Sequence, residues 1–104
     1  MPNFKRLRKE LDEFHRSKKP ELELAPIEKW MVRNLGVKKI GMKGVKVSYF
    51  HSALTATGRD GVFTIHVVHG RRRVKVNKHD FCNFLYKRLL EIIDVMDKEN
   101  SNAR

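Results

Sequence analysis

The chain contains 104 residues, a length that suits a single domain. Hydrophobic residues make up 40% of it and charged residues 34%, which is typical of a globular protein with disorder only at its ends. It has no apolar run of the roughly 18 residues that a membrane helix needs, no secretory signal pattern, and a single cysteine, which permits no internal disulfide. We therefore expect no membrane span and a cytosolic or nuclear compartment.

The charge balance narrows the class of partner. Lysine and arginine total 23 against 12 aspartate and glutamate, which gives a formal net charge of +11. A field of this sign attracts polyanions, whether nucleic acid, anionic lipid headgroups or acidic protein segments. Charge alone does not choose among these three.

Residues 1–20 are predicted to form a basic amphipathic arm. Apolar residues recur there at spacings of three and four, which predicts one stripe on a short helix: Phe4, Leu7, Leu11 and Phe14. The helix should end before Pro20, because the residue before a proline disfavours helical dihedrals. The other faces carry the first candidate polyanion contacts, Lys5, Arg6, Arg8, Lys9 and Arg16. The alternative is that these charges only keep a packed helix soluble.

A second helix is predicted over residues 26–35, since proline suits a first helical position and apolar residues follow at helical spacing. Gly36 then stands where a left-handed C-cap would lie. Residues 38–44 are predicted to be a basic loop, and alternation over residues 45–49 predicts a half-buried strand. The loop supplies two further candidate contacts, Lys38 and Lys39.

The segment after this strand is predicted to contain a hairpin. Residues 51–60 fit either a helical turn or a loop, and a β-branched strand follows over residues 62–68. His69-Gly70 suits a tight turn into a third strand over residues 71–76. That strand would carry candidate anion contacts, with Arg71 and Arg73 on one side and Arg72 on the other, and with Lys75 beyond. The alternative is a charged edge that prevents strand pairing.

A long C-terminal helix is the clearest element. Asn77 suits its N-cap, Asp80 suits its first turn, and apolar residues repeat at helical spacing to about residue 98. Residues 100–104 should fray. The chain is thus predicted to be one α+β domain over residues 21–99, with a small antiparallel sheet of about three strands, flanking helices and this long helix. A winged-helix arrangement is one option for it.

Chemistry-bearing patterns are sparse. His66, His69, His79 and Cys82 form two pairs with metal-ligand spacing, but Cys82 lies in an apolar helix turn where cysteine usually acts as a small core residue. No motif frames a nucleophile, and no glycine-rich phosphate loop is present. We therefore expect no enzyme activity, no cofactor and no metal. Tyr49-Phe50 could stack on bases, although one ring in the core and one outside is the favoured interpretation.

Two segments resemble the cytosolic N-terminal domain of the Sec-sixty-two translocation protein family of the endoplasmic reticulum. The first is an ungapped stretch that contains Trp30-Met31, Asn34, Lys38, Met42, Gly44, Val47, Tyr49 and Phe50. The second is the start of the last helix, Asp80-Phe81-Cys82-Asn83, and the separation of the two segments is close to that in the family. Residues 51–76 match poorly. In this resemblance the matching residues look like framework, and the basic groups would make the contacts.

The resemblance implies a subunit of the protein-translocation machinery on the cytosolic face of the endoplasmic reticulum. In that family the basic N-terminal domain contacts the acidic C-terminal tail of a J-domain partner subunit, and in some members the ribosome. The family has two membrane spans after this domain, and this sequence carries none. The chain would then be the cytosolic domain, a shortened relative or a protein outside the family.

Two functions therefore remain open. The leading hypothesis is a non-enzymatic adaptor that binds an acidic partner segment or the ribosome through its basic surface. The alternative is a small nucleic-acid-binding protein, ribosomal or regulatory, whose arm and Arg71–Arg73 hairpin contact phosphates.

Overall fold

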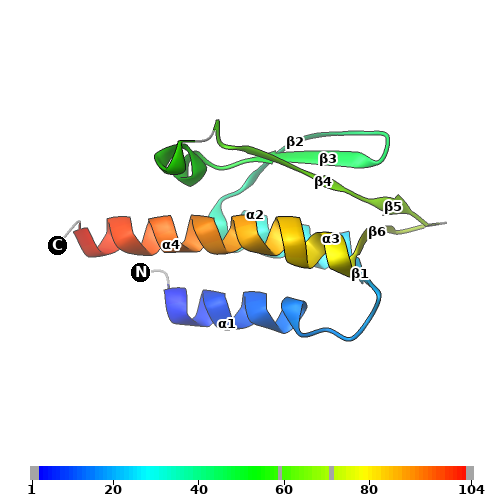
Figure 1. Ribbon diagram of the computed structural model, residues 1–104, viewed down its shortest axis with the longest axis horizontal. Helices are drawn as coiled ribbons and strands as arrows, with labels where there is room; N and C mark the ends of the chain where they lie inside the picture. Colours follow the sequence, from blue (N-terminus) through cyan, green and yellow to red (C-terminus); the bar gives the residue numbers. More distant parts are fainter. Residues whose placement is uncertain (1–2, 59, 71, 103–104) are drawn as a thin grey trace.

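The computed structural model describes residues 3–58, 60–70 and 72–102, and it confirms the predicted α+β class and the long C-terminal helix (Figure 1). The first half contains α1 (Phe4–His15), β1 (Glu21–Glu23), α2 (Leu24–Leu35), β2 (Lys38–Lys43) and β3 (Lys46–Phe50). The second half contains the short 3-10 helix η1 (Ser52–Thr57), β4 (Val62–His66), β5 (Val68–His69) and β6 (Val74–Asn77). The C-terminal helix consists of α3 (Lys78–Asp80), the π-helical turn η2 (Phe81–Leu85) and α4 (Tyr86–Asn102).

The strands of the described residues form two three-stranded antiparallel sheets where the sequence predicted one. Their orders are β1-β6-β5 and β2-β3-β4. β4 and β5 are consecutive parts of one extended segment that passes from the second sheet to the first. At the passage between them, the N–H of Val67 donates to the carbonyl of Val45 at 2.7 Å, and the His69 ring contacts the Gly44 carbonyl at 2.7 Å. These two bonds hold the sheets together where the strand bends.

This arrangement corrects two sequence predictions. Residues 38–44 are not a loop, because Lys38–Lys43 form the edge strand β2, which turns back into β3 through Gly44 at φ +60°. Residues 62–76 are only partly a hairpin, because β4 pairs with β3 while β5 alone pairs with β6. The physical reason is burial: the alternation that places Phe63 and Ile65 inside lets β4 cover the core beside the buried residues of β3.

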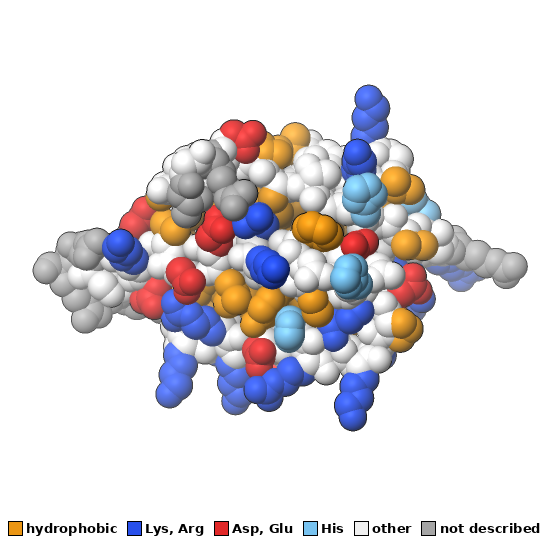
Figure 2. All heavy atoms as spheres, viewed as in Figure 1, with side chains coloured by type: hydrophobic (Ala, Val, Ile, Leu, Met, Phe, Trp, Pro, Cys, Tyr) orange, Lys and Arg blue, Asp and Glu red, His pale blue; other side chains and the backbone are white. Residues whose placement is uncertain are grey.

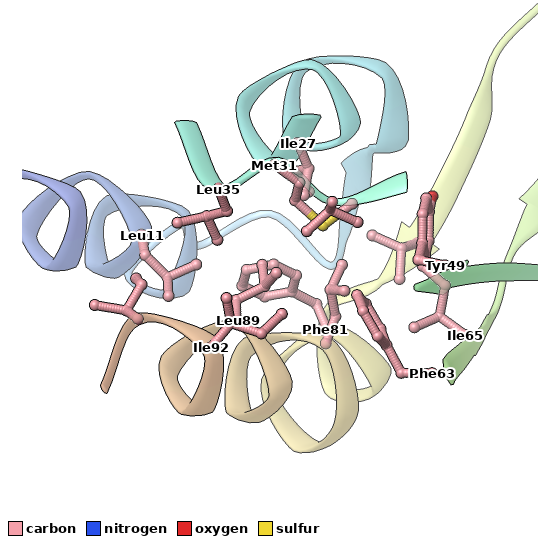
Figure 3. Close-up of a cluster of buried hydrophobic side chains, with 14 of the residues drawn as sticks. Leu11, Ile27, Met31, Leu35, Tyr49, Phe63, Ile65, Phe81, Leu89 and Ile92 are labelled. Carbon is pink, nitrogen blue, oxygen red and sulfur yellow. The ribbon is translucent and has the colours of Figure 1, made fainter. Parts of the chain in front are cut away.

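The core forms around the apolar side of the C-terminal helix, whose fully buried residues are Phe81, Leu85, Leu89, Ile92 and Ile93. Side chains from α1, α2 and the β2-β3-β4 sheet converge on this side, among them Leu11, Met31 and Tyr49 (Figure 3). In the view of Figure 1 the C-terminal helix runs between α1 below it and that sheet above it, so the two flank its apolar side from different directions. Residues 4–15 are therefore a docked helix of the same core as the rest of the chain.

One charged cluster joins α1 to α4, and the predicted capping residues end α2 and begin the C-terminal helix. The guanidinium of Arg8 on α1 bonds Asp94 and Asp97 of α4, each at 2.9 Å, and these bonds raise its pKa. The predicted caps are confirmed: Gly36 ends α2 at φ +73°, and the Asn77 side chain accepts from the N–H of His79 at 2.8 Å. The last helix continues past residue 98 to Asn102.

Within the described residues, none of the helices has both the length and the apolar character that a bilayer crossing requires.

The docking of α1 yields a stability prediction. We expect Leu11→Ala to lower the free energy of unfolding by about 2–5 kcal/mol, because Leu11 is fully buried and its truncation leaves a cavity. Arg16→Ala, at the C-cap of α1, is the control. Arg16 is 80% exposed and its ion pair, among the described residues, is with Asp12, so the loss should stay below about 0.5 kcal/mol. Urea denaturation measures both. Equal, small losses would mean that α1 contributes nothing to the core.

Candidate functional site

Two of the predicted basic clusters meet at one groove, which we call the β2 groove. It has a volume of about 480 Å³ and lies between the edge strand β2, the start of α2 and the turn between β5 and β6. Its cations are Lys39, Arg72 and Arg73, and its carboxylates are Glu23 and Glu28. Its apolar lining includes Leu24, Met42 and Val74. The groove thus combines positive charge with apolar surface.

The strand register shows which residues of β2 face the groove. Lys39 lies opposite Tyr49 and Met42 lies opposite Val47, so both belong to the sheet face that is turned toward the core, the inner face. The shift in register between Lys39 and Gly41 is a bulge, and it lets these two side chains share that face although three positions separate them. The inner face of β2 therefore forms one wall of the groove.

The turn between β5 and β6 positions Arg72 and Arg73 beside the groove. The N–H of Gly70 donates to the carbonyl of Arg73 at 2.8 Å and closes the turn, and β6 begins only at Val74. The predicted alternation of the arginines along a strand is therefore wrong for Arg72 and Arg73, which are exposed turn residues that both line the groove. Arg71 lies outside the described residues. Lys75 follows in β6, opposite Glu23 of β1.

Glu28 connects the groove to the core. Its carboxylate accepts a hydrogen bond from the hydroxyl of Tyr49 at 2.8 Å and pairs with Lys39 at 3.3 Å. Burial, and then this hydrogen bond, raise the pKa of Tyr49 above its ordinary value. Arg73 pairs with Glu23. Exposed pairs of this kind contribute only about 0–1 kcal/mol each, so an acidic ligand can replace Glu23 at little cost.

The candidate contacts on α1 divide into paired and unpaired groups. Arg8 is held by α4, Arg6 pairs with Glu10 at 3.7 Å, and Arg16 pairs with Asp12 at 2.7 Å. Lys5 and Lys9 are exposed and have no ion pair within the described residues. The same holds for Arg72, which lines the groove, and for Lys38 of β2, which lies outside its lining. Figure 2 shows lysine and arginine side chains gathered along the α1 edge of the molecule.

A second basic depression lies between α1 and α2, and the sequence did not indicate it. Arg6, Lys29 and Arg33 line it together with Trp30, and its volume is about 550 Å³. The Trp30 indole N–H donates to Glu10 at 3.3 Å, and its ring meets Phe14 edge to face with centroids 6.2 Å apart. The helical spacing of Lys29 and Arg33 was the available sign that they share one face of α2.

The other candidate chemistries have little support in the geometry. The predicted division of the Tyr49-Phe50 pair is confirmed, because Tyr49 is fully buried and Phe50 is only half-buried. The Tyr49 ring packs against the buried ring of Phe63 on the inner face of the sheet, with centroids 5.4 Å apart. They are therefore closed to stacking with nucleic-acid bases. Across the described residues, histidine, cysteine and acidic side chains nowhere gather in threes as metal ligands would. Cys82 is half-buried in the π-helical turn.

No family model, curated protein or solved structure matches this chain. The resemblance to the Sec-sixty-two family and the winged-helix option therefore remain predictions.

The raised pKa of Tyr49 predicts a specific alkaline instability. Because the folded state holds this hydroxyl protonated, its contribution is complete below the unfolded pKa of about 10 and is lost as the pH rises above it. The free energy of unfolding should then fall by about 1.4 kcal/mol per pH unit more in the native protein than in Tyr49→Phe. Denaturation at pH 8 and pH 11 measures the difference. Parallel losses in the two proteins would contradict the burial of a neutral tyrosine.

Proposed function

We propose that this protein is a non-enzymatic adaptor that binds an acidic segment of a partner protein at the β2 groove. The observation that carries the proposal is the meeting of Lys39, Arg72 and Arg73 around apolar surface. Isolated surface cations are ordinary, but three cations from two distant segments around one apolar groove favour a ligand that has both acidic and apolar groups.

The make-up of the groove favours a peptide over nucleic acid. Glu23 and Glu28 lie among the cations, and both would repel a continuous phosphate backbone. Met42 and Val74 offer apolar contact that suits side chains and does little for sugar or phosphate. The described lining of the groove contains no aromatic ring on which a base could stack. A peptide with spaced carboxylates and apolar residues avoids each of these costs.

The Sec-sixty-two resemblance supports a biological setting for the proposal. In that setting the partner would be the acidic tail of a J-domain translocation subunit, or the ribosome, at the cytosolic face of the endoplasmic reticulum. The net charge of +11 suits either partner. The rival function is nucleic-acid binding, and the depression between α1 and α2 with Arg6, Lys29 and Arg33 is the feature that favours it.

Charge reversal at two sites tests the location of binding. We expect Arg72→Glu, a change at an exposed cation that lines the groove, to weaken the binding of a labelled acidic dodecapeptide about tenfold or more, a loss of about 1.4 kcal/mol. Lys5→Glu is the matched control, because it changes the net charge equally at an exposed residue that also lacks an ion pair within the described part of the chain. The control should lose less than about threefold. Fluorescence anisotropy at constant salt measures both. Equal losses would mean that the peptide responds to the net charge of the protein and not to the groove.

Removing a carboxylate should have the opposite effect. Glu23→Gln releases Arg73 from its internal partner, so we expect the same acidic peptide to bind about threefold more tightly. A single-stranded RNA of similar charge, titrated at equal salt, distinguishes the rival function. If the RNA binds far more tightly than the peptide, or if Glu23→Gln leaves peptide affinity unchanged, the groove is not the site of an acidic segment.

A further inference from the structure

We infer that the acidic partner segment binds in an extended conformation and adds a strand to the free edge of β2. This inference rests on the proposed function and specifies its geometry. β2 pairs with β3 on one side only, and no strand of the described residues covers its other side (Figure 1). All six residues of β2 are exposed. Its outward N–H and C=O groups are therefore open to a peptide backbone, the usual basis of strand addition.

The charges of β2 select the occupant. Three of its six residues are lysines, Lys38, Lys39 and Lys43, and two copies paired edge to edge would bring these like charges together. Lysines and a bulge are also the features by which proteins protect an edge from aggregation. β2, however, also exposes Ile40 at 58% and Met42 at 39%. An edge that repels its own copies yet displays apolar side chains is complementary to a chain with acidic and apolar residues.

An added strand would meet a binding surface on both faces of the sheet. On the inner face its side chains would lie beside Lys39 and Met42, above the β2 groove and near Arg72. On the outer face Gly41 lies opposite Ser48 and leaves a depression of about 520 Å³. The lining of this depression also includes Ile40, Met42, Lys43, Lys46 and Thr64. Because successive side chains of a strand alternate between faces, each face would receive every second residue of the peptide.

The length of β2 sets the size of the contact. Its six residues span about 20 Å at the rise of an antiparallel strand, so a segment of about six residues covers it. The outward backbone groups of such a segment provide the affinity, and the lysines with Arg72 provide the preference for acidic residues. Anionic segments that stay helical would leave these backbone groups unused.

N-methylated peptides test the backbone pairing directly. In a paired strand only alternate residues direct their N–H toward the neighbour. We would prepare one acidic, non-repetitive peptide that binds the full chain, and two versions with N-methyl groups on the odd or on the even residues. Strand addition predicts that one version loses about tenfold or more in affinity while the other stays within about twofold. Equal affinity of the two versions, whether both bind or neither binds, would overturn the inference.

The same experiment separates this inference from the proposed function. If Arg72→Glu weakens the binding of the unmodified peptide, the adaptor function is supported, whichever result the methylated peptides give. Sedimentation velocity of the free protein tests the alternative that a second copy of the chain occupies the β2 edge. We expect a monomer, and a dimer that the acidic peptide does not dissociate would show that a second copy occupies the edge and would overturn strand addition.

Discussion

Burial of one side of the C-terminal helix is the constraint on which the structure depends. Phe81, Leu85 and Ile92 are fully buried, and α1, α2 and the inner face of the β2-β3-β4 sheet all pack around this side. A sheet that turns its inner face toward a helix must turn its outer face toward solvent. The same packing leaves β2 at an uncovered edge, since β3 and β4 together supply the buried aromatic residues Tyr49 and Phe63. The candidate site is therefore a direct consequence of how the core is covered.

The positive charge of the chain is distributed in two ways in the described structure. Arg8 uses its charge for folding, because it joins α1 to α4 through two carboxylates. Lys38 and Arg72 are exposed without an ion pair among the described residues. Internal pairing does not reduce the net charge of +11, but it decides where the uncompensated charge stands. In the β2 groove the exposed Arg72 lies beside apolar surface, and this combination supports the proposed binding site.

The helices could be predicted from the sequence because each buries a stripe at helical spacing, as Leu7 and Leu11 do in α1. β2 could not, because all its side chains are exposed and its extended form depends on the turn at Gly44 and on pairing with β3. The division of β4 from β5 depends on the bond between Val67 and Val45, which are distant in the chain. The candidate cations could be picked out from the sequence, but Lys39 and Arg72 are brought to one groove only by the tertiary structure. The pairing of Arg8 with Asp94 could not be predicted either, because the two residues are 86 positions apart in the chain and meet only when α1 packs on α4.

The central claim is that an acidic segment docks along β2 and the β2 groove, and amide hydrogen exchange followed by NMR tests it most directly. Spectra of the labelled chain would be recorded with and without a saturating acidic peptide. The account predicts slower exchange for outward-facing amides of β2 and shifted resonances at Arg72 and Arg73, with α1 unchanged. Shifts confined to Lys5, Lys9 and the α1–α2 depression, with β2 exchanging as in the free protein, would contradict it.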